Sequence, residues 1–102
     1  MNHERRTNLR IPLKLPARYD GLSGRYEARI EDISLGGCFV NARGQVQEGD
    51  AITVEINLPS GEWLRLPGNV TAYYPGIGFG VGFTNLTLAQ ELTLEQLVAS
   101  SL

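Results

Sequence analysis

Residues 52–58 read Ile52-Thr53-Val54-Glu55-Ile56-Asn57-Leu58, and every second side chain in this stretch is apolar. Successive side chains of an extended strand point to opposite faces of a sheet, so the alternation predicts a strand with one buried face. The next four residues, Pro59-Ser60-Gly61-Glu62, have the composition of a turn and lead into Trp63-Leu64-Arg65-Leu66. The sequence therefore predicts a β-hairpin at its centre.

Further short runs of the same kind lie on both sides of this hairpin. Clusters of turn residues such as Asp20-Gly21-Leu22-Ser23-Gly24 and Pro75-Gly76 separate them. Pro16 lies within the first run, which indicates an edge position or a β-bulge there. Including the hairpin, we expect strands within residues 13–19, 25–31, 38–40, 52–58, 63–73 and 78–83.

The end of the chain carries the one helical pattern. Thr87 and Gln90 have the spacing of a capping box, which predicts a helix at about residues 88–100. We expect its apolar face to consist of Leu88, Leu92, Leu94, Leu97 and Val98. The predicted fold is thus all-β: a small six-stranded antiparallel β-barrel with a C-terminal α-helix packed on it. Residues 1–11 are predicted to form a flexible, Arg-rich N-terminal tail, and residues 12–102 a single barrel domain.

Charge is distributed unevenly along the 102 residues, whose net charge is −2. Residues 1–43 hold eight basic and five acidic residues, a net +3, whereas residues 44–102 hold one basic and six acidic residues, a net −5. A long polyanion requires a continuous basic face, so we expect one local anionic ligand and no DNA or RNA partner. The same acidic half argues against an OB-like barrel that binds single-stranded nucleic acid.

Several classes of site are excluded by residue counts. The chain has a single cysteine, Cys38, which cannot form an internal disulfide or a Cys-rich zinc site. Its single histidine, His3, lies in the predicted flexible tail, which makes a Ser-His-Asp triad improbable. We therefore expect no enzyme activity and no cofactor, and we expect Cys38 to pack as a small hydrophobe.

No apolar stretch is long enough for membrane insertion, and no signal-peptide core follows Met1, so the expected location is cytoplasmic.

Two short motifs carry residue types that bind nucleotides. The first is Arg6-Thr7-Asn8-Leu9-Arg10, preceded by Arg5, and arginine can grip phosphate, bind a guanine edge or stack on a ring. The second is Asp32-Ile33-Ser34-Leu35-Gly36-Gly37, in which the carboxylate can accept from the Watson–Crick edge of guanine and the hydroxyl can donate to a phosphate. Each has a structural alternative: a solvated basic tail for the first, and an Asx or Ser turn with glycines at positive φ for the second.

The two motifs in this order, on an all-β pattern, resemble the signature of the PilZ domain family. The late Gly80-Val81-Gly82-Phe83 is similar to the Gly-rich closing strand of that family. The resemblance implies binding of cyclic di-GMP, a bacterial second messenger, on the outer surface of the barrel. It implies that Arg6 and Arg10 grip phosphates and guanine Hoogsteen edges. The remaining implied site residues are Asp32 and Ser34, which would contact guanine, and Gly36 and Gly37, of which Gly37 would keep the surface clear.

Arg5 is an addition to the bare motif. It could stack on a guanine of a second, intercalated ligand molecule, or it could only add positive potential, and both readings stay open. Among the aromatic residues, Trp63 and the outward-facing member of the pair Tyr73 and Tyr74 are further candidates for base stacking, against the alternative of cross-strand packing.

The predicted function is therefore a cyclic di-GMP receptor that changes conformation on binding and signals through an unidentified protein partner. The alternative is a protein-interaction module of the same fold that needs no nucleotide. One or two ligand molecules per chain are both compatible with the motifs. We expect a monomer, with a dimer as the open alternative.

Overall fold

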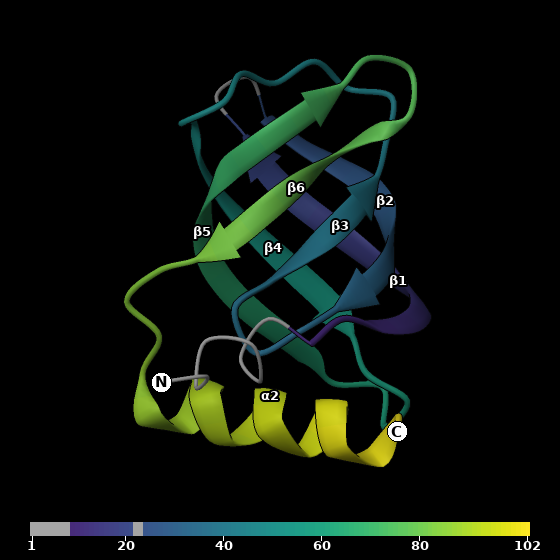
Figure 1. Ribbon diagram of the computed structural model, residues 1–102, viewed down its shortest axis with the longest axis vertical. Coiled ribbons are helices and arrows are strands. Elements are labelled where there is room, and N and C mark those ends of the chain that lie inside the picture. Colours follow the sequence, from purple (N-terminus) through teal and green to yellow (C-terminus); the bar gives the residue numbers. More distant parts are fainter. Residues whose placement is uncertain (1–8, 22–23) are drawn as a thin grey trace.

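The computed structural model describes residues 9–21 and 24–102, and it forms a closed barrel of six antiparallel strands (Figure 1). Around the barrel the strands follow the order β1-β2-β3-β6-β5-β4. The elements are β1 (Ile11–Gly21), β2 (Gly24–Ile33), β3 (Gly37–Asn41), β4 (Ala51–Asn57), β5 (Trp63–Tyr74), β6 (Gly78–Phe83) and the helix α2 (Leu88–Ser100). The predicted all-β class, the six-stranded barrel and the C-terminal helix are all confirmed.

The central hairpin forms as its alternation predicts. Ile52, Val54 and Ile56 of β4 are at most 4% exposed and point into the barrel. The intervening Glu55 faces outward and pairs in register with Arg65 of β5. Burying the apolar face of every strand inside one closed sheet supplies the main stabilisation of the fold, because removal of apolar surface from water is favourable.

The first strand starts at Ile11, inside the predicted tail of residues 1–11. Ile11 is 6% exposed and is paired with Ile33 of β2, so its burial extends the strand to this point. The register of β1 against β2 shifts between Pro12 and Leu15, whereas Pro16 is paired in register with Arg29, so the bulge predicted at Pro16 lies earlier in the strand. Pairing of β1 with β4 begins at Ala17. Pro16, which has no N–H to donate, therefore lies just before the β1–β4 ladder and leaves no gap in its hydrogen bonds.

The helix α2 crosses one end of the barrel, at the bottom of Figure 1. Its capping box is confirmed: Gln90 N–H donates to Thr87 Oγ1 at 3.1 Å, and Thr87 N–H donates to Gln90 Oε1 at 2.7 Å. The amide of Gln90 also donates to the carbonyl of Arg65 at 2.8 Å, which ties the start of α2 to β5. No helix in the described ranges is long and apolar enough to cross a membrane.

The predicted apolar face of α2 is wrong for two of its five members. Leu94 and Leu97 are buried against the barrel, whereas Leu88 is 70% exposed and Leu92 is 51% exposed. A helix turns about 100° per residue, so Leu92 and Leu94 point in nearly opposite directions and cannot both face the barrel.

Candidate functional site

The corner between β2 and β3 is built around the buried hydroxyl of Ser34, which is 3% exposed. Ser34 Oγ accepts hydrogen bonds from the N–H groups of Gly36 and Gly37, both at 3.1 Å, and donates to the carbonyl of Gly37 at 3.3 Å. A hydroxyl has one donor and two acceptor positions, so these three bonds use its full capacity. The Ser turn is therefore present, and Ser34 fixes the backbone of the second motif.

Gly37 is required by a close approach between strands. It is paired with Gly82 of β6, and a Cβ at position 37 would collide with the carbonyl oxygen of Val81. Neither Gly36 nor Gly37 is among the glycines with positive φ, so the turn does not use them in the way that the structural alternative predicts. The carbonyl of Gly36 also accepts from the N–H of Phe83 at 2.9 Å, which anchors the corner to β6.

Asp32 and Arg10 bring the two motifs together. Arg10 precedes β1 and Asp32 lies in β2, and Arg10 Nη1 donates to Asp32 Oδ1 at 2.6 Å. The side chain of Arg10 is 51% exposed and that of Asp32 is 30% exposed, so both groups remain open to solvent. The structure thus places a guanidinium and a carboxylate, from positions 22 residues apart, side by side next to the Ser34 corner.

A second cluster of charges lies beside this pair on the outer face. Glu31 of β2 accepts a hydrogen bond from Asn41 Nδ2 at 2.9 Å, and both Lys14 Nζ and Arg29 Nε lie 3.8 Å from its carboxylate. Lys14 is 72% exposed and Arg29 60% exposed, whereas Glu31 is 25% exposed. Two exposed basic side chains around one carboxylate leave a positive excess on this face, which favours an anionic ligand.

The cysteine behind this face is inert. Cys38 is fully buried, and burial, helped by the nearby charge of Asp32, raises the pKa of its thiol to about 12. The thiol is therefore protonated at neutral pH, which fits the expected role of a small core hydrophobe.

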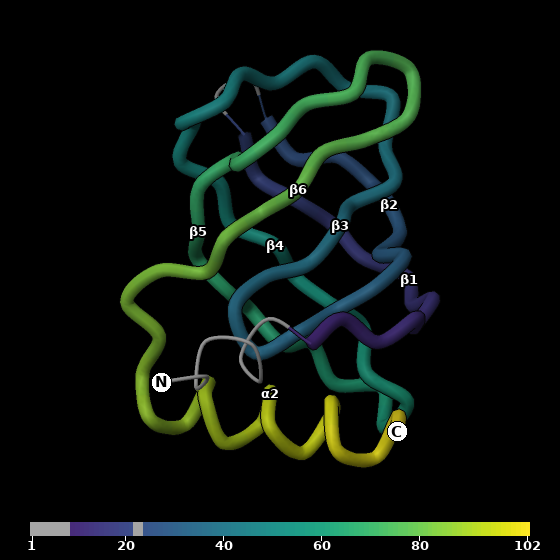
Figure 2. Tube along the Cα trace, viewed as in Figure 1, coloured from purple at the N-terminus to yellow at the C-terminus, as the bar shows by residue number. Residues whose placement is uncertain are grey.

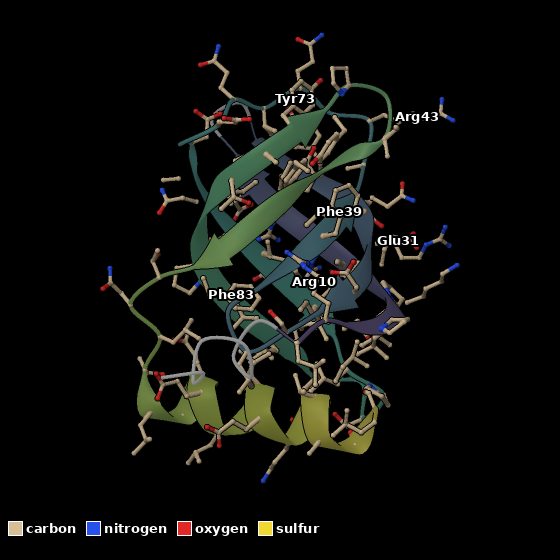
Figure 3. All side chains as sticks on the ribbon, viewed as in Figure 1. Arg10, Glu31, Phe39, Arg43, Tyr73 and Phe83 are labelled. Atoms are coloured by element: carbon tan, nitrogen blue, oxygen red, sulfur yellow. The ribbon has the colours of Figure 1, made fainter. Side chains whose placement is uncertain are left out.

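Sequence reasoning missed one aromatic residue at the site, Phe39. It is paired in register with Asp32 on one side and with Gly80 on the other, so its half-buried ring lies on the outer face beside the ion pair. Figure 3 shows Phe39 and Arg10 on the same face of the barrel. The signal was available, because Cys38 and Val40 point inward and the residue between them must point outward.

The other aromatic candidates are explained by packing. Trp63 has the guanidinium of Arg18 stacked 3.7 Å from its ring centroid, on β1 and β5 away from the corner. Tyr74 is the outward member of its pair, 51% exposed, and its ring centroid lies 5.9 Å from that of Phe39. Tyr73 is half-buried and packs against the core.

Of the seven predicted site residues, Arg10, Asp32, Ser34, Gly36 and Gly37 are brought together, and Arg5 and Arg6 lie outside the described residues. Among residues 9–21 and 24–102, no group of three or more His, Cys, Asp or Glu side chains could hold a metal ion.

The fold of this chain is similar to that of several solved structures. The PilZ domain of CeSA from a cellulose-synthesizing bacterium is 26% identical, with a TM-score of 0.72 over 91% of this chain and 97% of that one. The PilZ domain of YcgR from Escherichia coli, solved with c-di-GMP, is 16% identical, with a TM-score of 0.74 over 91% and 88%.

The PlzA protein of Borreliella burgdorferi, solved in complex with c-di-GMP, is 15% identical, with a TM-score of 0.67 over 86% of this chain and 38% of PlzA. A search of the curated proteins found no match. The family model described as PilZ domain matches residues 4–100, which is nearly the whole chain and includes both motifs. The chain therefore belongs to the PilZ domain family.

Proposed function

We propose that this protein is a cyclic di-GMP receptor whose ligand binds across Arg10, Asp32 and the Ser34–Gly37 corner. The observation that carries the proposal is the 2.6 Å pair between Arg10 and Asp32, because it brings the two motifs within reach of one ligand. The c-di-GMP complexes of YcgR and PlzA, which share the fold, support the same ligand class.

Each group at this face has chemistry that matches part of the ligand. Cyclic di-GMP has two phosphates and two guanines, and a guanidinium binds either a phosphate or guanine O6 and N7 with two parallel hydrogen bonds. The Asp32 carboxylate accepts from the N1–H and exocyclic amine of guanine. Ser34 acts by fixing the corner, since all three hydrogen-bonding positions of its hydroxyl are used within it.

The proposal includes Arg5 and Arg6 of the first motif, which would add phosphate contacts or stack on guanine. Their recruitment by the ligand would be the conformational change, and the altered surface would be recognised by a protein partner. Ordering several arginines costs side-chain entropy, so several charge-assisted bonds are needed to outweigh it.

Isothermal titration with cyclic di-GMP tests the proposal, using the wild-type chain and Arg10→Ala. Each charge-assisted bond is worth on the order of 1.5–3 kcal/mol, so Arg10→Ala should weaken binding at least about tenfold. Arg43→Ala is the matched control, because it removes the same charge from an exposed residue on the loop after β3, away from the corner (Figure 3). Absence of binding heat for the wild-type chain in low salt would refute the proposal.

The alternative function, a protein-interaction module that needs no nucleotide, makes the opposite prediction for this titration. The wild-type chain would give no heat with cyclic di-GMP. Binding of an isolated partner would also be the same for the wild-type chain and for Arg10→Ala, with or without nucleotide.

A further inference from the structure

A second concave site lies at the end of the barrel opposite α2. It is a cleft of about 810 Å³ between the ends of β1, β2 and β5 and the segment that leads into β4. Figure 2 shows that this segment crosses the upper end of the barrel, while α2 covers the lower end. The volume lies within the range of small-molecule sites, and none of the described motif residues lines the cleft.

Three tyrosines from three strands form its aromatic wall. They are Tyr19 of β1, Tyr26 of β2 and Tyr73 of β5. The ring centroids of Tyr19 and Tyr26 are 5.3 Å apart, and Phe79 supports Tyr19 from the core side at 5.1 Å, edge to face. Burial, with the neighbouring phenols of Tyr26 and Tyr73, raises the pKa of Tyr19, so its hydroxyl is protonated at neutral pH.

The hydroxyl of Tyr19 is the unusual group in this wall. The side chain is only 2% exposed, yet it lines the cleft. The hydroxyl lies against Gly44, where a Cβ would collide with it, and within the ranges 9–21 and 24–102 it is not among the fully buried polar atoms that lack a partner. A phenol hydroxyl can both donate and accept a hydrogen bond. An occupant of the cleft could bond to this hydroxyl.

The charged residues of the lining are all acidic. Glu48 is exposed and, within the described part of the chain, in no ion pair, and Asp50 uses Oδ2 to accept from the N–H of Gln47 at 2.9 Å. No Lys, Arg or His is among the described residues that line the cleft. Two carboxylates and three aromatic rings in one lining attract a cation, because the face of an aromatic ring also carries negative potential.

We propose that this cleft binds a small primary alkylammonium ligand. The ammonium would donate to the Tyr19 hydroxyl and to the carboxylates of Glu48 and Asp50, and the alkyl part would lie against the tyrosine rings. The site is separate from the Ser34 corner, because none of residues 32–37 lines the cleft.

Titration of the isotope-labelled full chain with 1,4-diaminobutane, followed by backbone amide NMR, tests the proposal. Its matched neutral probe is 1,4-butanediol, which has the same length and no charge. We expect saturable shifts at Tyr19, Tyr26 and residues 47–51 with the diamine, and none that saturate with the diol. Arg10→Ala should leave this binding unchanged.

Glu48→Gln should weaken diamine binding about two- to fivefold, because it removes one exposed charge pair. Glu62→Gln, in the exposed turn between β4 and β5, is the control for net charge and should have no effect. The proposal is overturned if the diamine produces no saturable shifts, if the diol binds as tightly, or if Glu62→Gln weakens binding as much as Glu48→Gln.

Discussion

Replacement of Ser34 by alanine separates the structural role of the second motif from its role in ligand binding. The change removes the acceptor that holds the N–H groups of Gly36 and Gly37. Gly36 is exposed, so its N–H can turn to water, but Gly37 is buried and its N–H loses the partner that the structure provides. A buried donor without a partner costs about 1–3 kcal/mol, so we expect a loss of about 2 kcal/mol in the free energy of unfolding.

Thermal and urea unfolding of the ligand-free protein measure this loss. For a domain of this size, 2 kcal/mol corresponds to a decrease in Tm of roughly 10 °C. Ser60→Ala is the matched control, because Ser60 Oγ accepts from Glu62 N–H at 3.3 Å in an exposed turn, and the change should stay within about 0.5 kcal/mol. Arg10→Ala should cost less than about 1 kcal/mol, because its ion pair is solvent-exposed. If Ser34→Ala unfolds at the wild-type temperature, our account of the corner is wrong.

Three further predictions concern the helix and the core. Thr87→Ala should lower the free energy of unfolding by about 1 kcal/mol, measured in urea, because it removes the capping box with Gln90. Leu92→Gln should change it by less than about 0.5 kcal/mol, whereas Leu94→Ala should cost about 2–5 kcal/mol, since only Leu94 is buried. Cys38 should resist iodoacetamide at pH 8 unless urea is present. The folded thiol has a pKa of about 12 against an ordinary value of 9.0, so the unfolded chain loses its proton first and stability should fall as pH rises through that interval.

The fold follows from the sequence wherever one face of an element is buried. The alternation of Ile52, Val54 and Ile56 determines both the strand and which of its faces is buried, because a shift of one residue would turn all three to solvent. The start of the helix follows from the hydrogen-bonding chemistry of Thr87 and Gln90. The face of α2 could not be derived in the same way, since its leucines are distributed around the helix and the position of the barrel decides which of them are covered.

The site is harder to predict from the sequence than the fold is. Residue type indicated that Arg10 and Asp32 could bind a nucleotide, but their direct pairing depends on how the chain enters β1 beside β2. The role of Gly37 was predicted as an open surface for the ligand. The structure adds a reason inside the protein, the close approach of Val81 on β6, which only the strand order β3-β6 creates.

The ion pair between Arg10 and Asp32 is compatible with ligand binding, although each group already has a partner. A carboxylate offers about four acceptor positions and a guanidinium five donors, so one shared bond leaves most of both groups available. Because the pair holds both side chains in place before binding, less rotamer entropy is lost when the ligand arrives. The pair is also neutral overall, so the net positive charge offered to the phosphates would have to come from neighbours such as Lys14 and Arg29 and from the arginines that precede Arg10. Recognition of guanine would therefore depend on the preformed pair, and attraction of the phosphates on the charges around it.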